Sequence, residues 1–175
     1  LFNEQLAFVR DPHPFATAVC SRRSGKTVAC AADLLNTATS NEDSVCLYIT
    51  LSRSNAEKII WPELQKINRE FQLGGKENNS RLSMKFGEDS IIYLAGANDK
   101  TEIEKFRGLK LRKVYIDESQ SFPQYIEGLI DDVLTPALMD YAGHLRLIGT
   151  PSPVPSGYFY KCAQSSNWAH HGWTF

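Results

Sequence analysis

A short apolar run that leads through Ser-Gly-Lys-Thr into an alanine-rich segment constrains this chain more than any other feature. The apolar run spans Phe15 to Cys20 (FATAVC), and the alanine-rich segment VACAADLLNTA follows Thr27. A β-prone run, a polar loop and a run of good helix formers, in that order, predict strand, loop and helix. The chain is therefore expected to contain an α/β unit whose loop closes onto the N-terminus of a helix.

The rest of the chain repeats this alternation. Further strands are expected at 44–51, 82–86, 90–95, 113–116 and 144–148, the second and third forming a hairpin. Helices are expected at 54–71, 100–106 and 123–141, with a loop at 73–80. In the first of these helices, apolar residues from Ile59 to Phe71 share one face, and Pro62 and Pro136 are expected to interrupt their helices. Alternating strands and helices predict a mostly parallel sheet covered on both faces.

Size and charge limit the classes of function. With 175 residues, of which 42% are apolar, the chain is expected to form one domain with one ordinary core. A net charge of −1 excludes nucleic-acid binding through a bulk positive field, so any such contact requires a local patch. No apolar run approaches the roughly 20 residues that cross a bilayer, and no signal peptide is evident. The four cysteines lack metal-ligand spacing, which predicts buried free thiols in a reduced compartment.

The loop CSRRSGKT, from Cys20 to Thr27, carries the end of the phosphate-binding pattern GxxxxGK[ST]. A loop at a helix start directs unpaired backbone N–H groups and the positive end of the helix dipole at an anion. Gly25 allows close approach to phosphate oxygens, Lys26 supplies a charge for the β- and γ-phosphates, and the Thr27 hydroxyl is placed for Mg²⁺. Cys20 stands where the pattern has its first glycine. The alternative is an ordinary helix N-terminus with an exposed lysine.

Two further segments end in polar residues at the end of an apolar strand. Asp117 and Glu118 follow VYI, and a strand next to that of the phosphate loop would bring Asp117 to the magnesium site. Glu118 would then orient and deprotonate the attacking water. The alternative is a solvated acidic turn. Thr150, in GTPSP, would lie at the same sheet edge and sense the γ-phosphate, although GTPSP by itself is also an ordinary proline-rich turn.

Taken together, these residues resemble a family: the ATPase domain of the large subunit of tailed-phage and herpesvirus-type terminases, the motors that package viral DNA. The resemblance rests on four blocks in order, which are CSRRSGKT, FRG…VYIDE (106–118), GTPSP with the downstream Gly-Tyr-Phe (157–159), and HHGWTF at the end. Phosphate loops of that family tolerate a residue other than glycine at the first position and carry an arginine four residues before the lysine, here Arg22.

The resemblance implies an α/β P-loop NTPase fold of the ASCE type, a three-layer sandwich around a mostly parallel sheet. It implies ATP and Mg²⁺ as cofactors, Asp117 and Thr27 on the metal, and Glu118 as catalytic base. The nucleotide-binding residues that it implies are Gln5, Ser21, Arg22, Arg23, Ser24, Gly25, Lys26, Thr27 and Thr150. Gln5 matches an adenine-contacting glutamine of the family, and the competing interpretation is an exposed residue of an amphipathic helix.

A further cation at the γ-phosphate is expected, because charge builds on the group being transferred. Arg22 could supply it from within the same chain, and Arg107 either there or in a neighbouring subunit. Arg107 lies in the basic stretch KFRGLKLRK (105–113), which holds five Lys or Arg. That stretch could also contact DNA phosphates or simply be a solvated charged loop. His170 and His171 are expected at a sheet edge or in a linker rather than on a metal.

The predicted function is ATP hydrolysis that powers movement of double-stranded viral DNA into a procapsid, in the cytoplasm of the infected host cell and without a membrane. The resemblance implies the portal protein and the small terminase subunit as partners, and a homo-oligomeric ring. Residues 1–175 are expected to be a single P-loop ATPase domain, with the family's C-terminal nuclease domain, and hence nuclease activity, absent from this chain. One alternative is a helicase-like translocase ATPase, suggested by Ser119-Gln120 after the acidic pair. Another is a nucleotide-gated binding module without turnover.

Overall fold

The chain folds around a single eight-stranded sheet. The computed structural model describes residues 1–98, 104, 106–152 and 154–174. The strand order is β3-β4-β5-β2-β6-β7-β1-β8; all neighbours from β5 to β8 are parallel, whereas β3–β4 and β4–β5 are antiparallel. The strands are β1 (Phe15–Cys20), β2 (Val45–Thr50), β3 (Lys76–Asn78), β4 (Ser83–Phe86), β5 (Ser90–Gly96), β6 (Leu111–Ile116), β7 (His144–Gly149) and β8 (Ala169–Trp173).

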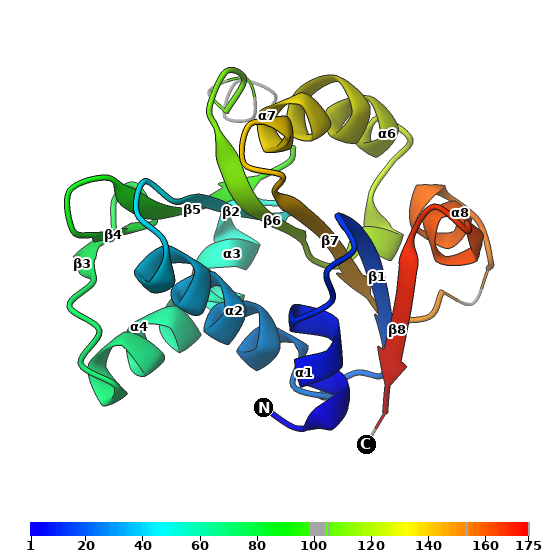
Figure 1. Ribbon diagram of the computed structural model, residues 1–175. Helices are drawn as coiled ribbons and strands as arrows, with labels where there is room; N and C mark the ends of the chain where they lie inside the picture. Colours follow the sequence, from blue (N-terminus) through cyan, green and yellow to red (C-terminus); the bar gives the residue numbers. More distant parts are fainter. Residues whose placement is uncertain (99–103, 105, 153, 175) are drawn as a thin grey trace.

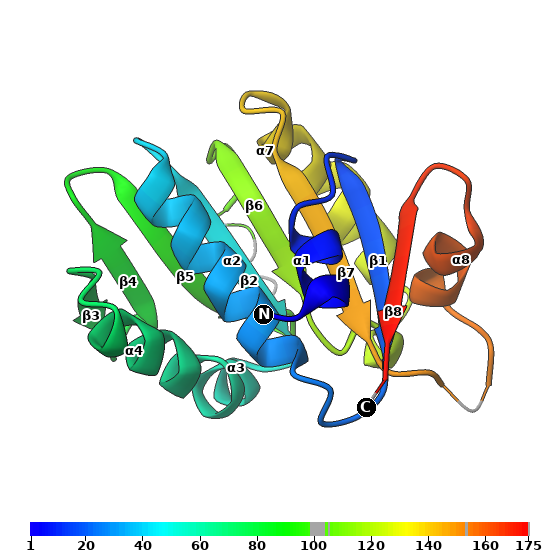
Figure 2. The same cartoon turned by 60° about the horizontal axis from the view of Figure 1, so that its bottom comes forward.

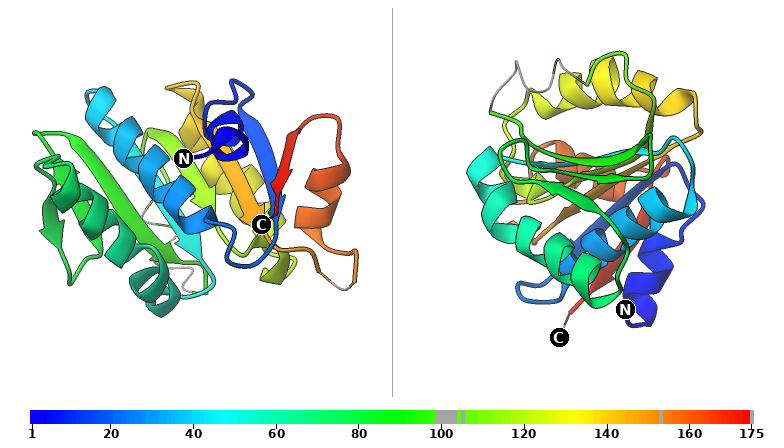
Figure 3. Two further views of the ribbon diagram at one scale, coloured as in Figure 1. Left: turned by 90° about the horizontal axis from the view of Figure 1, so that it is seen from below. Right: turned by 90° about the vertical axis from the view of Figure 1, so that its left-hand side faces the viewer.

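Helices cover both faces of this sheet, which confirms the three-layer α/β architecture (Figure 1 and Figure 3). One face carries α1 (Asn3–Val9), α2 (Lys26–Ser40), α3 (Arg53–Ile59) and α4 (Trp61–Glu70). The other carries α6 (Ile126–Leu129), a π-helical turn (Ile130–Leu134), α7 (Thr135–Met139) and α8 (Tyr158–Gln164), and a 3₁₀ turn (Ser119–Ser121) follows β6. The predicted strands and the hairpin at 82–95 are all present. All four cysteines are buried and unpaired, and burial raises the pKa of the Cys20 thiol to about 11.

Three local expectations need correction or fall outside the described residues. The stretch 73–80, predicted as a loop, contains β3, whose polar and fully exposed residues give no alternating pattern. The expected interruption of 54–71 at Pro62 is confirmed, since the segment divides at Ile60 and Pro62 occupies the first turn of α4. Phe71, expected on the apolar face, instead follows the last residue of α4 and is 71% exposed. The helix expected at 100–106 falls mainly on residues outside the described ranges.

The predicted interruption near Pro136 takes the form of a widened helical turn. The π-helical turn Ile130–Leu134 precedes Pro136, which occupies the first turn of α7 and has no N–H for the carbonyl of Asp132, four residues earlier. The guanidinium of Arg107 donates to that carbonyl oxygen at 3.2 Å. A side chain from the β5–β6 connection thus satisfies a backbone group that the proline leaves without its helical partner.

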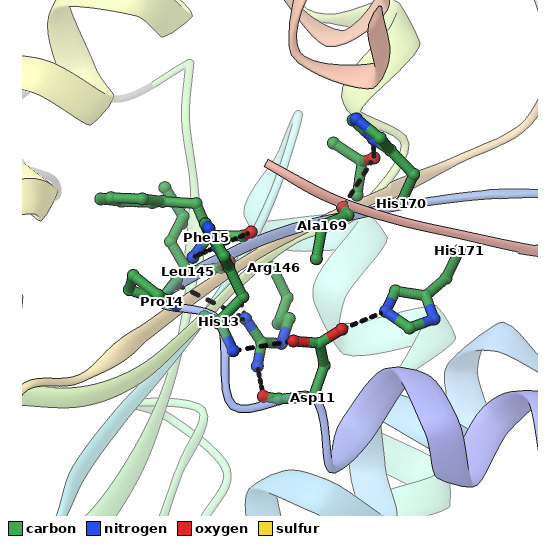
Figure 4. Close-up of polar contacts among 10 residues, drawn as sticks. Asp11, His13, Pro14, Phe15, Leu145, Arg146, Ala169, His170 and His171 are labelled. Carbon is green, nitrogen blue, oxygen red and sulfur yellow. Dashed lines mark hydrogen bonds and ion pairs between the residues drawn. The ribbon is translucent and has the colours of Figure 1, made fainter. Parts of the chain in front are cut away.

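The entry into β1 is held by a buried arginine. Arg146, in β7, is completely buried; its Nη1 donates to the carbonyl of His13 at 2.9 Å and its Nη2 to that of Asp11 at 2.6 Å (Figure 4). The Asp11 carboxylate contacts Nε2 of His171, in β8, at 2.7 Å. Burial works to raise the pKa of Asp11, but the His13 N–H and the His171 ring outweigh it and hold that pKa below its ordinary value. This network ties the segment before β1 to both neighbours of β1.

We expect Arg146→Met to lower the free energy of unfolding by about 3 kcal/mol, because methionine fills similar space but leaves buried carbonyl groups without a donor. Urea unfolding would measure the loss. Arg69→Met, at an exposed position in the last turn of α4, serves as the matched control and should change stability by no more than about 0.5 kcal/mol. Equal stability of the two variants would show that the Arg146 hydrogen bonds contribute nothing.

Candidate nucleotide site

The polar segments predicted from the sequence gather at one edge of the sheet. Because β1, β6 and β7 run parallel, the phosphate loop after β1, the acidic pair after β6 and Thr150 after β7 all leave the carboxyl ends of the strands (Figure 2). The expectation that the strand of the acidic pair would lie next to β1 is wrong, since β7 lies between β1 and β6. Strand order depends on pairing across the sheet, and the apolar run VYI carries no information about its neighbours.

The phosphate loop turns sharply onto the N-terminus of α2 through two residues with positive φ. Gly25 precedes α2 with a φ of 74°, and Arg23 also has a positive φ of 60°. The Lys26 ammonium and the Ser24 hydroxyl both donate to the carbonyl oxygen of Ser21, each at 2.8 Å. The Ser21 hydroxyl oxygen is buried and has no hydrogen-bond partner in the described part of the chain. The loop therefore holds its lysine within the cradle and offers an unused polar group beside it.

Gln5 reaches this loop from α1. The side chain is 4% exposed, so the interpretation as an exposed residue of an amphipathic helix is wrong. Its amide Nε2 donates to the carbonyl oxygen of Gly25 at 3.0 Å, while its Oε1 accepts the backbone N–H of Phe2 at 3.3 Å. Gln5 thus contacts the backbone of the phosphate loop directly.

Asp117 is buried among groups that favour its carboxylate form. It is 4% exposed, and desolvation raises its pKa, although three groups act in the opposite direction. The Tyr48 hydroxyl donates to Oδ2 at 2.5 Å, the Glu118 N–H donates to Oδ1 at 2.8 Å, and the charge of Lys26 also favours the ionised form. The parallel pairing of β1 with β7 and of β7 with β6 places Lys26 and Asp117 at the same edge of the sheet although β7 separates their strands.

Glu118 adopts a left-handed backbone conformation directly after the buried aspartate. Its φ of 53° and ψ of 37° turn the chain sharply at the end of β6, and the side chain is half-buried. Non-glycine residues in this conformation are uncommon and occur preferentially at functional sites. The turn separates the directions of the two adjacent carboxylates, so that Asp117 is buried while Glu118 retains access to solvent.

Gln120 joins the acidic segment to the end of β7. Its Oε1 accepts the backbone N–H of Thr150 at 3.1 Å, and Gly149 makes this approach possible, because a Cβ built there would lie 2.2 Å from Oε1. Gln120, which follows the acidic pair in the sequence, was not predicted to lie at this site. Tyr48 was also missed, as was Trp173, whose indole donates to the Ser24 carbonyl at 2.7 Å. The only available signal for Tyr48 was a hydroxyl in an apolar strand.

The arginines predicted for the site make fewer contacts with its described residues than the other predicted side chains do. Arg22 and Arg23 are exposed, and neither side chain makes a hydrogen bond or ion pair that the described residues reveal. Arg107 is exposed and forms a bidentate pair with Glu104, at 2.7 and 3.1 Å.

In the same basic stretch, Lys110 faces Asp140 at 3.8 Å and Lys113 is buried against Asp33 at 2.9 Å. The described part of 105–113 is therefore not a row of free positive charges.

One strand separates the phosphate-loop strand from the strand of the acidic pair in the parallel part of the sheet, and a lysine-bearing loop lies at its carboxyl edge. This arrangement defines a P-loop NTPase of the ASCE type. The terminase large-subunit family, described as T4likevirus-type, N-terminal, matches residues 18–136. The chain belongs to this family of terminase large-subunit N-terminal domains. The resemblance and the fold class expected from the sequence are thus confirmed, whereas no comparison supports the helicase-like alternative.

Solved structures give the same result for the fold. The ATPase domain of the large terminase of Thermus phage P74-26 superposes with a TM-score of 0.77 at 17% identity, covering 98% of this chain and 80% of that one. The large terminase of another thermophilic bacteriophage, in complex with ADP, gives 0.74 at 16% identity, covering 99% and 46%. The large terminase of bacteriophage HK97 gives 0.74 at 17% identity, covering 98% and 39%. No curated protein sequence matches.

We expect Gly149→Ala to lower the free energy of unfolding by about 1–3 kcal/mol, because the new methyl group displaces Gln120 and leaves the Thr150 N–H without its acceptor. Chemical denaturation would measure the change. Gly128→Ala is the matched control: it lies in α6, its added Cβ meets nothing closer than 3.6 Å, and helix propensity should raise stability by about 0.5–1 kcal/mol.

Combining Gly149→Ala with Gln120→Ala separates the clash from other effects at Gly149. Removing the glutamine amide removes the nearest atom that the new methyl group meets and leaves only the Phe159 ring, at 3.0 Å, so the double variant should lose less stability than the sum of the two single variants. Strict additivity would contradict the contact.

Proposed function

We propose that this domain binds ATP with Mg²⁺, hydrolyses it, and uses the energy to move double-stranded viral DNA into a procapsid. The observation that carries the proposal is the placement of a phosphate-loop lysine, a buried Asp117 and a solvent-accessible Glu118 at one edge of the sheet. Family membership supports it. Structures of the thermophilic bacteriophage's large terminase with ADP and with ATP-γ-S show that a protein of this fold binds nucleotides.

The residues at this edge of the sheet are suited to bind a nucleoside triphosphate together with Mg²⁺. The cradle offers loop N–H groups, the Lys26 ammonium and the unpartnered Ser21 hydroxyl to phosphate oxygens, with Arg22, Arg23, Ser24 and Gly25 completing the loop. Thr27 and Asp117 supply hard oxygen donors of the kind that Mg²⁺ prefers. Among the described residues there is no group of three or more His, Cys, Asp or Glu that would hold an ion alone. The ion that we propose therefore arrives with the phosphates, whose charge it neutralises.

In the proposed reaction, Glu118 accepts a proton from a water molecule that attacks the γ-phosphate in line with the leaving group. Lys26 leaves the carbonyl oxygen of Ser21 and follows the phosphate oxygens. Thr150 senses the γ-phosphate, and its hydrogen bond to Gln120 relays any shift of the acidic segment to β7. Gln5 contacts adenine at the rim of the loop, where its amide is already anchored to Gly25.

Arg22 and Arg107 are the two candidates for the additional cation. Arg22 lies within the phosphate loop and has no competing partner among the described residues, which favours action within the same chain. Arg107 would first have to leave Glu104 and the carbonyl of Asp132, which favours a role that begins on assembly of subunits.

DNA packaging is proposed here by comparison with large terminases that are longer than this chain. The chain spans less than half the length of the solved large terminases of the thermophilic bacteriophage and of HK97. We propose that residues 1–175 form the ATPase domain alone, without nuclease activity. In the infected host's cytoplasm this domain would act with the portal protein and the small terminase subunit, in a homo-oligomeric ring around the DNA. Among the described residues, no helix is long and apolar enough to cross a membrane.

Lys26→Ala should abolish nucleotide binding, because it removes the charge that neutralises the phosphates. Glu118→Gln should bind a fluorescent ADP analogue as the wild type does, while steady-state phosphate release falls by about 10²–10⁴-fold. Glu127→Gln, at an exposed position in α6, is the matched control and should leave both quantities unchanged. Wild-type binding without phosphate release, with DNA and partners present, would instead identify a nucleotide-gated module.

Mixing two inactive variants tests whether Arg107 acts between subunits. If it does, Arg107→Ala protein combined with Lys26→Ala protein should recover part of the lost ATPase activity, because the second variant donates its intact arginine to the first. Phosphate release at concentrations that assemble the ring would measure this recovery. Absence of recovery, with assembly verified by sedimentation, would contradict the intersubunit role.

A further inference from the structure

The edge strand β8 touches the phosphate loop at two points, and the same residue makes both contacts. The carbonyl oxygen of Trp173 accepts the backbone N–H of Ser21 at 3.2 Å, which extends the parallel ladder of β1 and β8 beyond Cys20. Its indole Nε1 donates to the carbonyl oxygen of Ser24 at 2.7 Å. A residue about 150 positions away in the sequence therefore holds both the beginning and the middle of the loop.

The second contact fixes the direction of a peptide group. In a trans peptide the N–H and C=O groups point in opposite directions, so holding the Ser24 carbonyl against the indole turns the Gly25 N–H the other way. On the next peptide, Gln5 and the Ala29 N–H of α2 both donate to the Gly25 carbonyl, at 3.0 and 3.1 Å, and thereby orient the Lys26 N–H. The Ser24 carbonyl is thus held from β8, and the Gly25 carbonyl from α1 and from the first turn of α2. The two N–H groups consequently face the cradle in which phosphate oxygens would lie.

Trp173 is itself rigidly placed. Its ring is 5% exposed and packs against Phe2 and Phe8 of the α1 region, with ring centroids 6.1 and 5.8 Å apart. The strand that carries it is secured to β1 by His170, whose Nδ1 lies 3.0 Å from the Thr17 hydroxyl, and to Asp11 by His171 (Figure 4).

We propose that Trp173 is a positioning residue for ATP binding: its indole N–H fixes the phosphate-loop peptide that presents the Gly25 N–H to the nucleotide. This inference rests on the proposed nucleotide site. It assigns β8 a part in nucleotide affinity, so that any displacement of this edge strand changes the shape of the phosphate cradle.

Trp173→Phe tests the proposal, because phenylalanine keeps an aromatic ring at this position and removes the indole N–H, together with part of the ring volume that the control variant also loses. Trp168→Phe is the matched control; Trp168 packs against Phe15, with ring centroids 5.2 Å apart, and its indole makes no hydrogen bond among the described residues. Affinity for a fluorescent ADP analogue should fall about tenfold in Trp173→Phe, with KM for ATP raised and kcat little changed. Trp168→Phe should bind as the wild type does. Lower thermal stability with unchanged ADP affinity would overturn the proposal.

Exchange of the indole protons, measured before and after addition of ADP, distinguishes this inference from the proposed function. In the wild-type chain, the Trp173 indole proton should exchange with solvent more slowly than that of Trp168 and should shift in the NMR spectrum on addition of ADP. Fast exchange of the Trp173 proton would overturn the inference whether or not the chain binds nucleotide. Slow exchange together with no ADP binding to the wild type would leave the contact intact and refute the proposed function.

Discussion

The parallel pairing of β1 with β7 on one side and β8 on the other is the constraint on which the candidate site depends. Parallel strands present their carboxyl ends at the same edge, so the phosphate loop, Thr150 and Trp173 meet although long segments separate them in the sequence. Had β8 run antiparallel to β1, its last residue would lie at the opposite edge, far from the loop. Arg146 supports this arrangement because its guanidinium satisfies the carbonyls of the segment that enters β1.

The positive charges of the chain differ in whether they are paired within the fold or available to a ligand. A net charge of −1 gives no general attraction to DNA, and the densest basic stretch contributes much of its charge to internal partners. Lys113, for example, pairs with Asp33, which also accepts the hydroxyl of Tyr115, so these charged groups are satisfied within the fold. At the carboxyl edge of the sheet, by contrast, Lys26 donates to a single loop carbonyl among the described residues, and Arg22 is exposed. Positive charge is thus left available where a polyphosphate would bind.

Most of the secondary structure could be predicted because it follows from local patterns. Buried strands appear as apolar runs, and Pro62 and Pro136 mark helix starts by the hydrogen bonds that they cannot form. The exposed strand β3 escaped prediction, since its residues pack against nothing that would select apolar side chains. Gln5 was interpretable as either exposed or ligand-binding, and the structure excludes the first interpretation by burying the side chain against the Gly25 carbonyl. A glutamine has the same composition and hydropathy in both situations, so no local pattern could separate them.

The sequence by itself determined the class of protein and the principal chemical groups. The phosphate loop is contiguous, and the two carboxylates are adjacent, so their chemistry is encoded within short stretches that can be interpreted without a fold. Only the tertiary structure decided the strand order, with β7 between β1 and β6, and the identity of the residues that hold the loop. Gln5, Gln120 and Trp173 act through hydrogen bonds to backbone groups. Every residue has such backbone groups, and therefore the partners of these three side chains leave no trace in the sequence of the loop itself.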